Sequence, residues 1–473
     1  MVTELKLDRT VHKAHLPFLM YICITSALGG FLWGFDAIVI SGTINSVKTQ
    51  FALSSGLEGL FVSSGLIGAV IGSGLSGWLS DRFGRSRNLI LAAALLLISA
   101  LGSGLASNIQ FLIIARWVGG LGVGISAMVC PLYISEISPT HLRGRLVTVF
   151  QFAITIGIMV ALFNNVALHR WAVFMAGRVG ESGFLKWFVV DETWRAMFAT
   201  ELIPGILFLS LALTLPESPR WLIKAGRSAP AQKVLSKIFI EGAEQEFNNI
   251  QRTIAEEDAT KKRFIDVFHP RYRKALFVAV SLAVFAQFSG INVVFYYGTS
   301  LLEDSGFKAD SALSGTAVIG FFNMIFTVLA MWLVDKLGRC KLLQIGTVGA
   351  ICCLMGVGLM FAGASKMLIV LMCGFVACFA FSLGPIKFIF ASEIFPTNIR
   401  SHAMSVVILS LWLADTLVGQ FFPILRDSVG PSTTFFIFAG ILVPQIVIVW
   451  KMMPETAGRS LEEIESWYVE KSQ

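Results

Sequence analysis

Long apolar stretches separated by short polar segments dominate this chain. A helix needs about 20 mainly apolar residues to cross a bilayer. Twelve stretches meet this requirement: 17–42, 57–80, 88–106, 110–135, 146–168, 195–215, 274–302, 312–334, 342–364, 367–392, 402–425 and 432–450. The pattern predicts an all-α membrane protein with twelve transmembrane helices.

The composition supports this interpretation. Among the 473 residues, 55% are hydrophobic and only 14% are charged, and the mean hydropathy is +0.74. A soluble protein carries roughly a quarter charged residues. The composition therefore excludes a soluble enzyme, a disordered scaffold and a single-span receptor with a large exterior domain.

The distribution of basic residues predicts the topology. The net charge is +7, but the basic residues lie between apolar stretches, which is the pattern of a membrane protein and not of a nucleic-acid-binding protein. Twelve spans place both termini on one side. The short loops on that side hold 15 Lys and Arg against 7 on the other side. We expect cytoplasmic termini in a plasma membrane or a bacterial inner membrane.

One long polar segment divides the chain into halves. Segment 216–273 is rich in charge, and its interspersed Leu, Ile and Val predict short amphipathic helices under the membrane. The expected organisation is a six-helix bundle over 1–215, linker helices over 216–273, a second six-helix bundle over 274–452 and a cytosolic tail over 453–473.

Three motifs recur at matching places in the two halves. Asp81–Arg85 matches Asp335–Arg339, Glu136–Arg143 matches Glu393–Arg400, and the segment from Pro216 matches the segment from Pro454. Two parallel repeats of six helices are typical of transporters that bind substrate near the midplane. Charged groups at these inner helix ends could latch the bundles together and release them as they rock: Asp81, Arg85, Glu136, Arg143, Glu217, Arg220, Asp335, Arg339, Glu393, Arg400, Glu455 and Arg459. The alternative is that the basic residues only set orientation.

These motifs resemble the sugar porter family of the major facilitator superfamily over essentially the whole chain. Within that family the chain looks most like the bacterial xylose–proton symporters. The stretches that carry the resemblance are Gly34–Gly42, Asp81–Arg85, Arg143–Arg145, Pro216–Leu222, Gln287–Tyr297, Ser392–Pro396 and Pro454–Thr456. The resemblance implies the major facilitator fold, a cytosolic helical linker, and alternating-access transport of a small sugar or polyol.

Three charged residues lie at one depth in the first half. Asp36, Arg116 and Glu201 each lie six residues from the outer end of their predicted span, roughly 9 Å below the surface. Charged groups inside a span are costly and point to function. A nearby arginine keeps a carboxylate ionised, and its withdrawal favours proton uptake. The resemblance implies proton coupling at Asp36, with Glu201 as a supporting acid. A static ion pair is the alternative.

Polar and aromatic groups of the second half form the candidate substrate site. Gln287, Asn292 and Tyr296 fall on one helical stripe. Together with Asn323 and Trp412, they match positions of the sugar site in the family that the chain resembles. Interhelical hydrogen bonding is the other interpretation of such Asn and Gln residues.

The chain departs from the xylose porters at several of these positions. Ile158, Ala286 and Leu411 stand where the resemblance implies glutamines, and Phe388 stands where it implies a tryptophan. Two charges, Lys387 and Asp415, are gained. Lys387 either reaches the surface with its long stem or faces the cavity. Asp415 either contacts substrate, pairs with Lys387 or titrates.

The predicted function is therefore proton-coupled symport of a monosaccharide or polyol, by a chain that works as a monomer without a cofactor or metal. The alternatives are a passive sugar facilitator, the same fold carrying a small organic anion, or a nutrient sensor that does not transport. About twenty residues follow the last span, which disfavours the sensor. The seven cysteines lack zinc-site spacing, and no phosphate-binding loop or nucleophile–base pair indicates an enzyme.

Overall fold

The computed structural model describes residues 15–139, 142–178, 183–260, 264–361 and 365–456, and all of the secondary-structure elements in this part are helices. Twelve of its helical segments are long and apolar enough to cross a membrane. They are Leu16–Gly42, Ser55–Phe83, Arg85–Gly104, Ile109–Ile137, Arg143–Met175, Thr193–Ala212, Pro270–Tyr296, Ala309–Ala330, Arg339–Met360, Lys366–Ile394, Ile399–Val429 and Pro431–Met452. The predicted fold class is confirmed.

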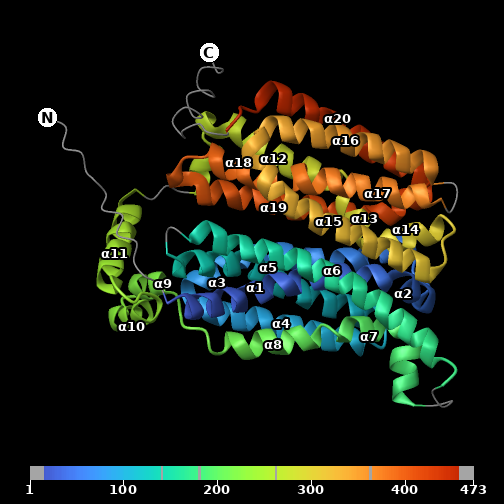
Figure 1. The fold of residues 1–473 in the computed structure, drawn as a ribbon, viewed down its shortest axis with the longest axis horizontal. Coiled ribbons are helices and arrows are strands. Elements are labelled where there is room, and N and C mark those ends of the chain that lie inside the picture. The colour runs from blue at the N-terminus through green and yellow to red at the C-terminus, as the bar shows by residue number, and fades with distance from the viewer. Residues whose placement is uncertain (1–14, 140–141, 179–182, 261–263, 362–364, 457–473) are drawn as a thin grey trace.

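The helices form two bundles that lie side by side (Figure 1). The N-terminal bundle contains α1 (Leu16–Val39), α3 (Ser55–Phe83), α4 (Arg85–Gly104), α5 (Ile109–Ile137), α6 (Arg143–Met175), α7 (Thr193–Ala199) and α8 (Leu202–Ala212). The C-terminal bundle contains α12 (Arg273–Phe288), α13 (Ile291–Tyr296), α14 (Gly298–Asp304), α15 (Ala309–Leu337), α16 (Arg339–Met360), α17 (Lys366–Cys378), α18 (Gly384–Ile394), α19 (Thr397–Val429) and α20 (Pro431–Met452).

Three short helices connect the bundles. They are α9 (Pro219–Lys224), α10 (Ser228–Ile238) and α11 (Ala243–Thr260), and they lie beyond one end of the N-terminal bundle (Figure 1). We call this the linker end and the opposite end the far end. The far end also carries a helix that the apolar pattern does not reveal, α2 (Ile44–Phe51).

Small residues allow the helices of each bundle to approach closely. A Cβ atom added to Gly120 on α5 would lie 1.9 Å from the carbonyl oxygen of Gly65 on α3. Such contacts between glycines bring two backbones together, and this packing replaces the hydrophobic force that is missing in lipid. The high glycine content of the chain is consistent with close helix packing of this kind.

The predicted span 274–302 is interrupted in the structure. Gly290 has φ +78°, a conformation that favours glycine, and it separates α12 from α13. A Cβ atom at Gly290 would lie 2.5 Å from the ring of Phe438. Glycine at this position therefore permits both the turn and the close contact with Phe438. The break also changes the direction in which the residues of α13 point.

The predicted span 195–215 is also divided, into α7 and α8. Pro204 has no N–H to give to the carbonyl oxygen four residues earlier, and its ring crowds that carbonyl. The helix therefore breaks at Thr200 and Glu201. Glu201 sits at this break, in the middle of the bundle.

The predicted span 367–392 contains a wide turn. The five residues Phe379–Leu383 form a π-helical segment between α17 and α18, and Pro385 lies at the start of α18. π-Helical turns are rare and often occur at functional sites. This one ends about one helical turn before Lys387.

Candidate functional site

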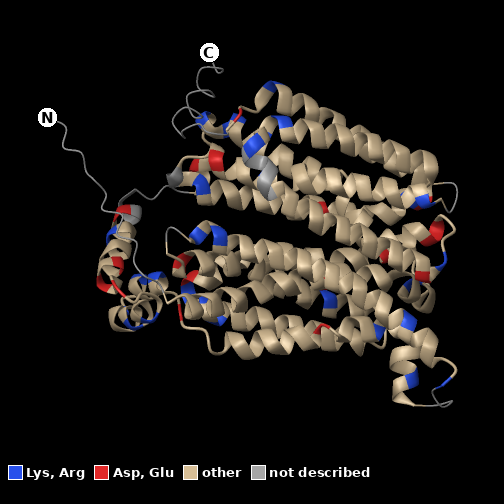
Figure 2. Cartoon of the chain, viewed as in Figure 1, with Lys and Arg blue, Asp and Glu red and all other residues tan. Residues whose placement is uncertain are grey.

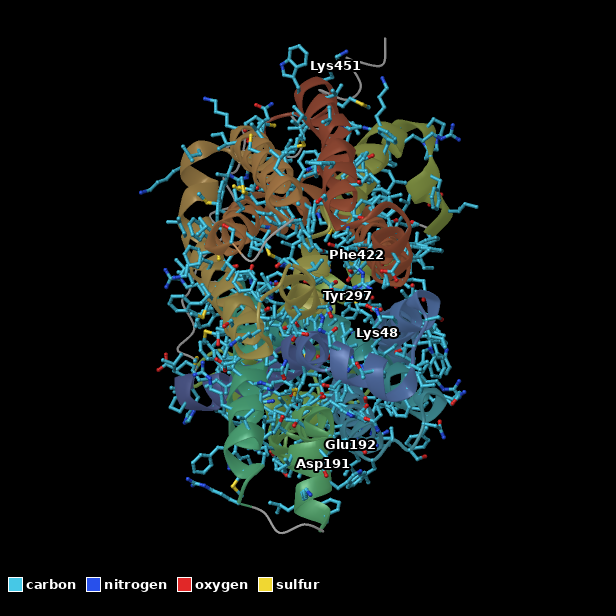
Figure 3. The ribbon with its side chains drawn as sticks, turned by 90° about the vertical axis from the view of Figure 1, so that its right-hand side faces the viewer. Lys48, Asp191, Glu192, Tyr297, Phe422 and Lys451 are labelled. Atoms are coloured by element: carbon cyan, nitrogen blue, oxygen red, sulfur yellow. The ribbon has the colours of Figure 1, made fainter. Side chains whose placement is uncertain are left out.

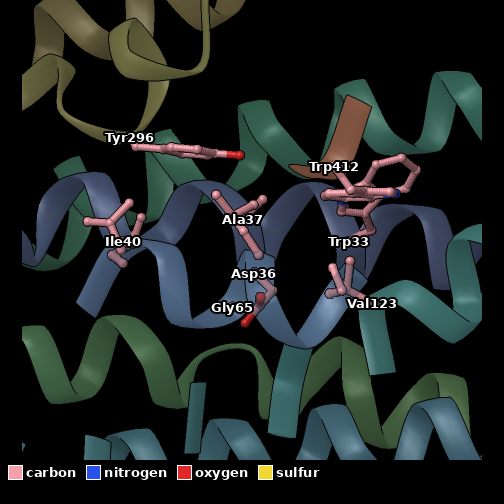
Figure 4. A pocket seen from close by; sticks show the side chains of 11 residues that line it. Trp33, Asp36, Ala37, Ile40, Gly65, Val123, Tyr296 and Trp412 are labelled. Carbon is pink, nitrogen blue, oxygen red and sulfur yellow. The ribbon is translucent and has the colours of Figure 1, made fainter. Parts of the chain in front are cut away.

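A small cavity lies between the two bundles. Its wall comes from α1, the 3-10 turn Ile40–Gly42 that follows it, α3 and α5 of the N-terminal bundle, and from α13 and α19 of the C-terminal bundle: Trp33, Asp36, Ala37, Ile40, Val62, Gly65, Leu66, Ala69, Val123, Tyr296 and Trp412. Figure 4 shows Tyr296 on one side and the pair Trp33 and Trp412 on the other. Aromatic faces with a few polar groups are suited to a small polyhydroxy ligand.

The first half places a buried ion pair at this cavity. The Nη1 atom of Arg116 donates to Oδ1 of Asp36 at 2.5 Å, and its Nη2 atom donates to the Asp36 carbonyl oxygen at 3.2 Å. Both residues are at least 97% buried. Arg116 also lies over the ring of Phe198, 5.4 Å from its centre. The structure thus brings together the two charges that the sequence places at one depth.

Glu201 completes a group of three charges. It is buried and interacts with both Asp36 and Arg116. Its Oε1 atom has no hydrogen-bond partner, and neither has Nε of Arg116. Polar atoms left unpaired in the interior are costly. The group is therefore incompletely satisfied in this conformation, which is expected of groups that exchange partners.

The second half places another buried carboxylate, Asp415, against the cavity residue Tyr296, although Asp415 itself does not line the cavity. The hydroxyl of Tyr296 donates to Oδ2 of Asp415 at 3.1 Å, and the side chain of Asn292 also interacts with this carboxylate. Asp415 is 2% exposed, and its Oδ1 atom has no partner. Two of the three residues on the predicted stripe therefore meet Asp415.

Lys387 is buried as well, and does not reach the surface. It is 6% exposed, and its Nζ atom lies 5.2 Å from the ring centre of Phe379 and 5.3 Å from that of Phe388. The ammonium group also interacts electrostatically with Asp415. The long stem of Lys387 therefore does not carry its charge to the surface, and Lys387 does not line the cavity either.

Of the other candidate substrate residues, one lines the cavity and the rest do not. Trp412 lines the cavity, and its ring centre lies 5.5 Å from that of Trp33 across the two bundles. Gln287 and Asn323 are buried but do not line this cavity. Phe388 is 37% exposed, so its ring lies at the edge of the packed interior.

The apolar replacements lie in the packed interior. Ala286 and Leu411 are buried, and Ile158 is half-buried against the core. None of them lines the cavity. Trp33 is a cavity residue that the sequence reasoning did not name, because a lone Trp in an apolar span carries no polar signal.

A second network that the sequence did not reveal joins the bundles at the far end. Glu58 on α3 is fully buried. Its carboxylate forms ion pairs with Nζ of Lys48 at 2.6 Å and with Nη2 of Arg426 at 3.2 Å. Arg426 comes from α19 of the other bundle, and also contacts Asp304 and Asp427 at 3.5 and 2.9 Å. We call these five residues the far-end network. Figure 3 views this end and labels Lys48 among its members.

Further polar contacts cross between the bundles at the same end. Asn45 donates to Glu303 and accepts from Ser300, and Arg170 forms an ion pair with Asp310 at 2.8 Å. Burial raises the pKa of Glu303, an effect that outweighs the hydrogen bond from Asn45. The hydroxyl of Ser63 donates to Oε1 of Gln420 at 2.7 Å. The far end is therefore closed by polar contacts between the bundles.

The linker end shows a different arrangement. Arg85 forms a two-pronged ion pair with Glu136, with both distances 2.9 Å, and contacts Asp81 at 3.5 Å. Glu217 accepts from the backbone N–H groups of Arg85 and Ser86 at 2.7 and 3.2 Å. All of these residues belong to the N-terminal bundle or the segment that directly follows it.

The second half repeats this cluster. Arg339 pairs with Glu393 at 3.0 Å, and Glu455 accepts from the backbone N–H groups of Arg339 and Cys340 at 2.9 and 3.0 Å. Arg400 donates to the carbonyl oxygen of Phe395. The side chain of Asp335 and the whole of Arg459 lie outside the described residues.

Gly84 and Gly338 show how closely the halves correspond. Both have positive φ angles, +93° and +81°, and each is covered by the carboxylate of the third motif: Glu217 over Gly84, Glu455 over Gly338. The remaining latch candidates of the first half, Arg143 and Arg220, line a surface cavity shared with Glu246 of α11. The ion pairs described at this end thus lie within one bundle, and a latch between the bundles stays a prediction for the opposite conformation.

Charge is otherwise scarce between the two ends (Figure 2). Among the described residues, no group of three or more His, Cys, Asp and Glu could hold a metal ion. The seven cysteines are free thiols.

Comparisons with known proteins agree with this architecture. The family model described as "Sugar (and other) transporter" matches residues 22–468. The chain is 40% identical to the arabinose–proton symporter of Bacillus subtilis, with 99% of each chain covered, and 35% identical to the D-xylose–proton symporter of Escherichia coli, with 95% of each covered. A solved structure of the E. coli xylose transporter in an inward-open conformation aligns with a TM-score of 0.78 at 34% identity, over 95% of this chain and 99% of that one. The chain belongs to the sugar porter family of the major facilitator superfamily, and is a multi-pass membrane transporter rather than an enzyme.

Proposed function

We propose that this protein is a proton-coupled symporter of a neutral monosaccharide that works by alternating access. The family and the named relatives, which include proton symporters of arabinose and xylose, support sugar–proton symport. The observation that carries the coupling is the buried group of Asp36, Arg116 and Glu201, in which Asp36 lines the cavity.

The chemistry of coupling follows from this group. While Arg116 contacts Asp36, its positive charge favours the ionised carboxylate. If rocking of the bundles moves the arginine away, burial favours the protonated form. One proton can then be taken up on one side and released on the other, with Glu201 as a second acid next to the pair.

The charges around the cavity also favour a neutral substrate. Three buried carboxylates, Asp36, Glu201 and Asp415, face two buried bases, Arg116 and Lys387. An anion entering this site would add to an excess of negative charge, whereas one bound proton balances it. This argues for a sugar rather than an organic anion.

The contacts between the bundles define the conformation. The far end is held by the far-end network and its neighbours, and the ion pairs of the linker end lie within the bundles. The excess of Lys and Arg in the short loops of the linker end supports a cytoplasmic location for that end. The conformation then corresponds to one that is closed to the outside, and one chain provides the complete pathway as a monomer.

Asp36→Asn tests the coupling. We expect the variant to lose uphill accumulation of sugar in proteoliposomes under an inward proton gradient, while sugar exchange without a gradient continues. Asp191→Asn, a carboxylate at an exposed position, is the matched control and keeps both activities. Accumulation by Asp36→Asn equal to that of the wild type would overturn the assignment. Exchange without accumulation by the wild type itself would make the protein a facilitator.

A further inference from the structure

The carboxylate of Asp415 is the feature of the cavity region that proton coupling does not use. It lies in the middle of α19, one helical turn after the cavity residue Trp412. Its Oδ2 atom is fixed by the hydroxyl of Tyr296, which also lines the cavity. Its Oδ1 atom is buried and has no hydrogen-bond partner.

An unpaired oxygen of a buried carboxylate is costly unless another state supplies its partner. The groups around Asp415 do not supply one in this conformation. Tyr296 has one hydroxyl hydrogen and gives it to Oδ2. The side chain of Asn292 also interacts with the carboxylate, but Oδ1 still has no hydrogen-bond partner. Lys387 directs its ammonium at the rings of Phe379 and Phe388. The missing donor must therefore enter with a ligand or with a change of conformation.

Lys387 explains how the carboxylate is tolerated at this depth. Its charge interacts with that of Asp415 without a direct ion pair among the described contacts, so the two together are electrically balanced while the oxygen stays available. A direct Lys–Asp ion pair would have occupied the oxygen. Aromatic rings hold the ammonium instead, by cation–π contacts.

We propose that Asp415 is a substrate-recognising group of this transporter, whose Oδ1 atom accepts a hydrogen bond from a hydroxyl of the bound sugar. Tyr296 orients the carboxylate, and Lys387 is a positioning residue that balances its charge. This inference rests on the proposed function, because it takes a hydroxylated neutral substrate.

The test compares binding of sugars and their deoxy analogues. Purified wild-type protein, Asp415→Asn and Asp415→Ala are reconstituted in proteoliposomes, and exchange of radiolabelled L-arabinose, D-xylose and D-glucose is measured in the presence of each monodeoxy analogue. We expect Asp415→Asn and Asp415→Ala to bind the transported sugar about tenfold to hundredfold more weakly, the range for a lost hydrogen bond to a charged group.

The analogues identify the hydroxyl. In the wild type, one monodeoxy analogue should bind more weakly than its parent sugar by a similar factor. In Asp415→Ala, the same analogue and its parent should bind equally, because the partner of that hydroxyl is gone. Thr416→Val, a change at the next position of α19, is the matched control and keeps the wild-type affinities.

A second variant separates recognition from folding. Lys387→Met leaves Asp415 as an uncompensated buried charge, so we expect lower thermal stability. The double variant Asp415→Asn with Lys387→Met should regain stability but not sugar affinity. This split between melting temperature and affinity would not arise from a purely structural role.

The outcomes distinguish the two proposals. If the wild type exchanges none of the sugars, the proposed function fails and this inference fails with it. If the wild type exchanges sugar and a folded Asp415→Asn or Asp415→Ala variant binds it within twofold of the wild type, only the role of Asp415 is overturned. For each monodeoxy analogue, its affinity is divided by that of the parent sugar. If this ratio is the same in the wild type and in Asp415→Ala for every analogue, the hydroxyl contact is also overturned.

Discussion

The two ends of the molecule use similar charged residues for different purposes. At the linker end, Arg85 and Arg339 pair with acids of their own bundle. At the far end, Arg426 pairs with Glu58 of the other bundle. Pairs within a bundle stabilise it in every conformation, whereas pairs between bundles stabilise only the conformation in which they meet. The position of an ion pair relative to the bundle boundary thus decides whether it contributes to stability or to the transport cycle.

The largest effect is expected from breaking the pair that crosses between the bundles. Arg426→Leu removes the ion pair between the bundles but leaves Glu58 paired with Lys48 at 2.6 Å. The cost should therefore lie below the roughly 3–5 kcal/mol of a buried charge left without any partner. The conformation in which the far end is closed should lose most of its population. The measurement is the distance between spin labels at residues 56 and 428, which lie on α3 and α19 at this end.

Glu136→Gln is the control for this experiment, since it removes a charge from the linker end and should leave the far-end distance unchanged. If Arg426→Leu leaves the distance distribution as in the wild type, the far-end network does not hold this end closed. A doubly changed protein, Glu58→Gln with Arg426→Leu, should be no more closed than Arg426→Leu alone, because the ion pair between the bundles is absent from both.

A smaller effect is expected from the pairs within the bundles, and it should differ between the halves. Arg85 and Glu136 have side chains 8% and 6% exposed, whereas Arg339 and Glu393 are 12% and 28% exposed. Water weakens the more exposed pair. Arg85→Ala should therefore lower the melting temperature more than Arg339→Ala, as measured by thermal unfolding in detergent. Equal losses, or a larger loss for Arg339→Ala, would contradict the ranking.

The smallest effect concerns pH at the far end. Burial raises the pKa of Glu303 in the closed conformation; the hydrogen bond from Asn45 and the charge of His169 lower this pKa, and the charge of Asp304 raises it. When this end opens, the carboxyl returns to its ordinary pKa. The closed form then binds the proton more tightly, so closure is favoured below the ordinary pKa and this contribution is lost as pH rises through the raised pKa.

The same spin-label distance reports this pH dependence. Lowering the pH from neutral should increase the closed population modestly in the wild type, and Glu303→Gln should flatten this response. An unchanged response in Glu303→Gln would assign the pH dependence to other groups.

Much of the fold could be predicted because its signals are local in sequence. Twelve apolar stretches and three repeated motifs are visible without any knowledge of contacts. The meeting of Asp36 and Arg116 could also be anticipated, because depth in a membrane follows from position in a span. Helix breaks were harder to predict. Gly290 and Pro204 interrupt apolar runs that otherwise read as continuous spans.

Contacts between the bundles could not be predicted from the sequence. Glu58 and Arg426 lie near span ends, where charges are expected for orientation alone. The contact between Trp33 and Trp412 depends on how far the bundles have rocked, and no local pattern encodes that. The roles of the site residues in binding and coupling stay predictions that the experiments above test.

The carboxylates of Glu217 and Glu455 have a mechanical consequence. Each comes from the segment that follows the last span of a bundle, and each holds the first backbone N–H groups of that bundle's third span, α4 or α16. Each of these segments is thereby held against the bundle that it follows. The start of the linker must therefore move together with the N-terminal bundle as a rigid body. A ligand or partner that holds the start of the linker would therefore also hold the N-terminal bundle.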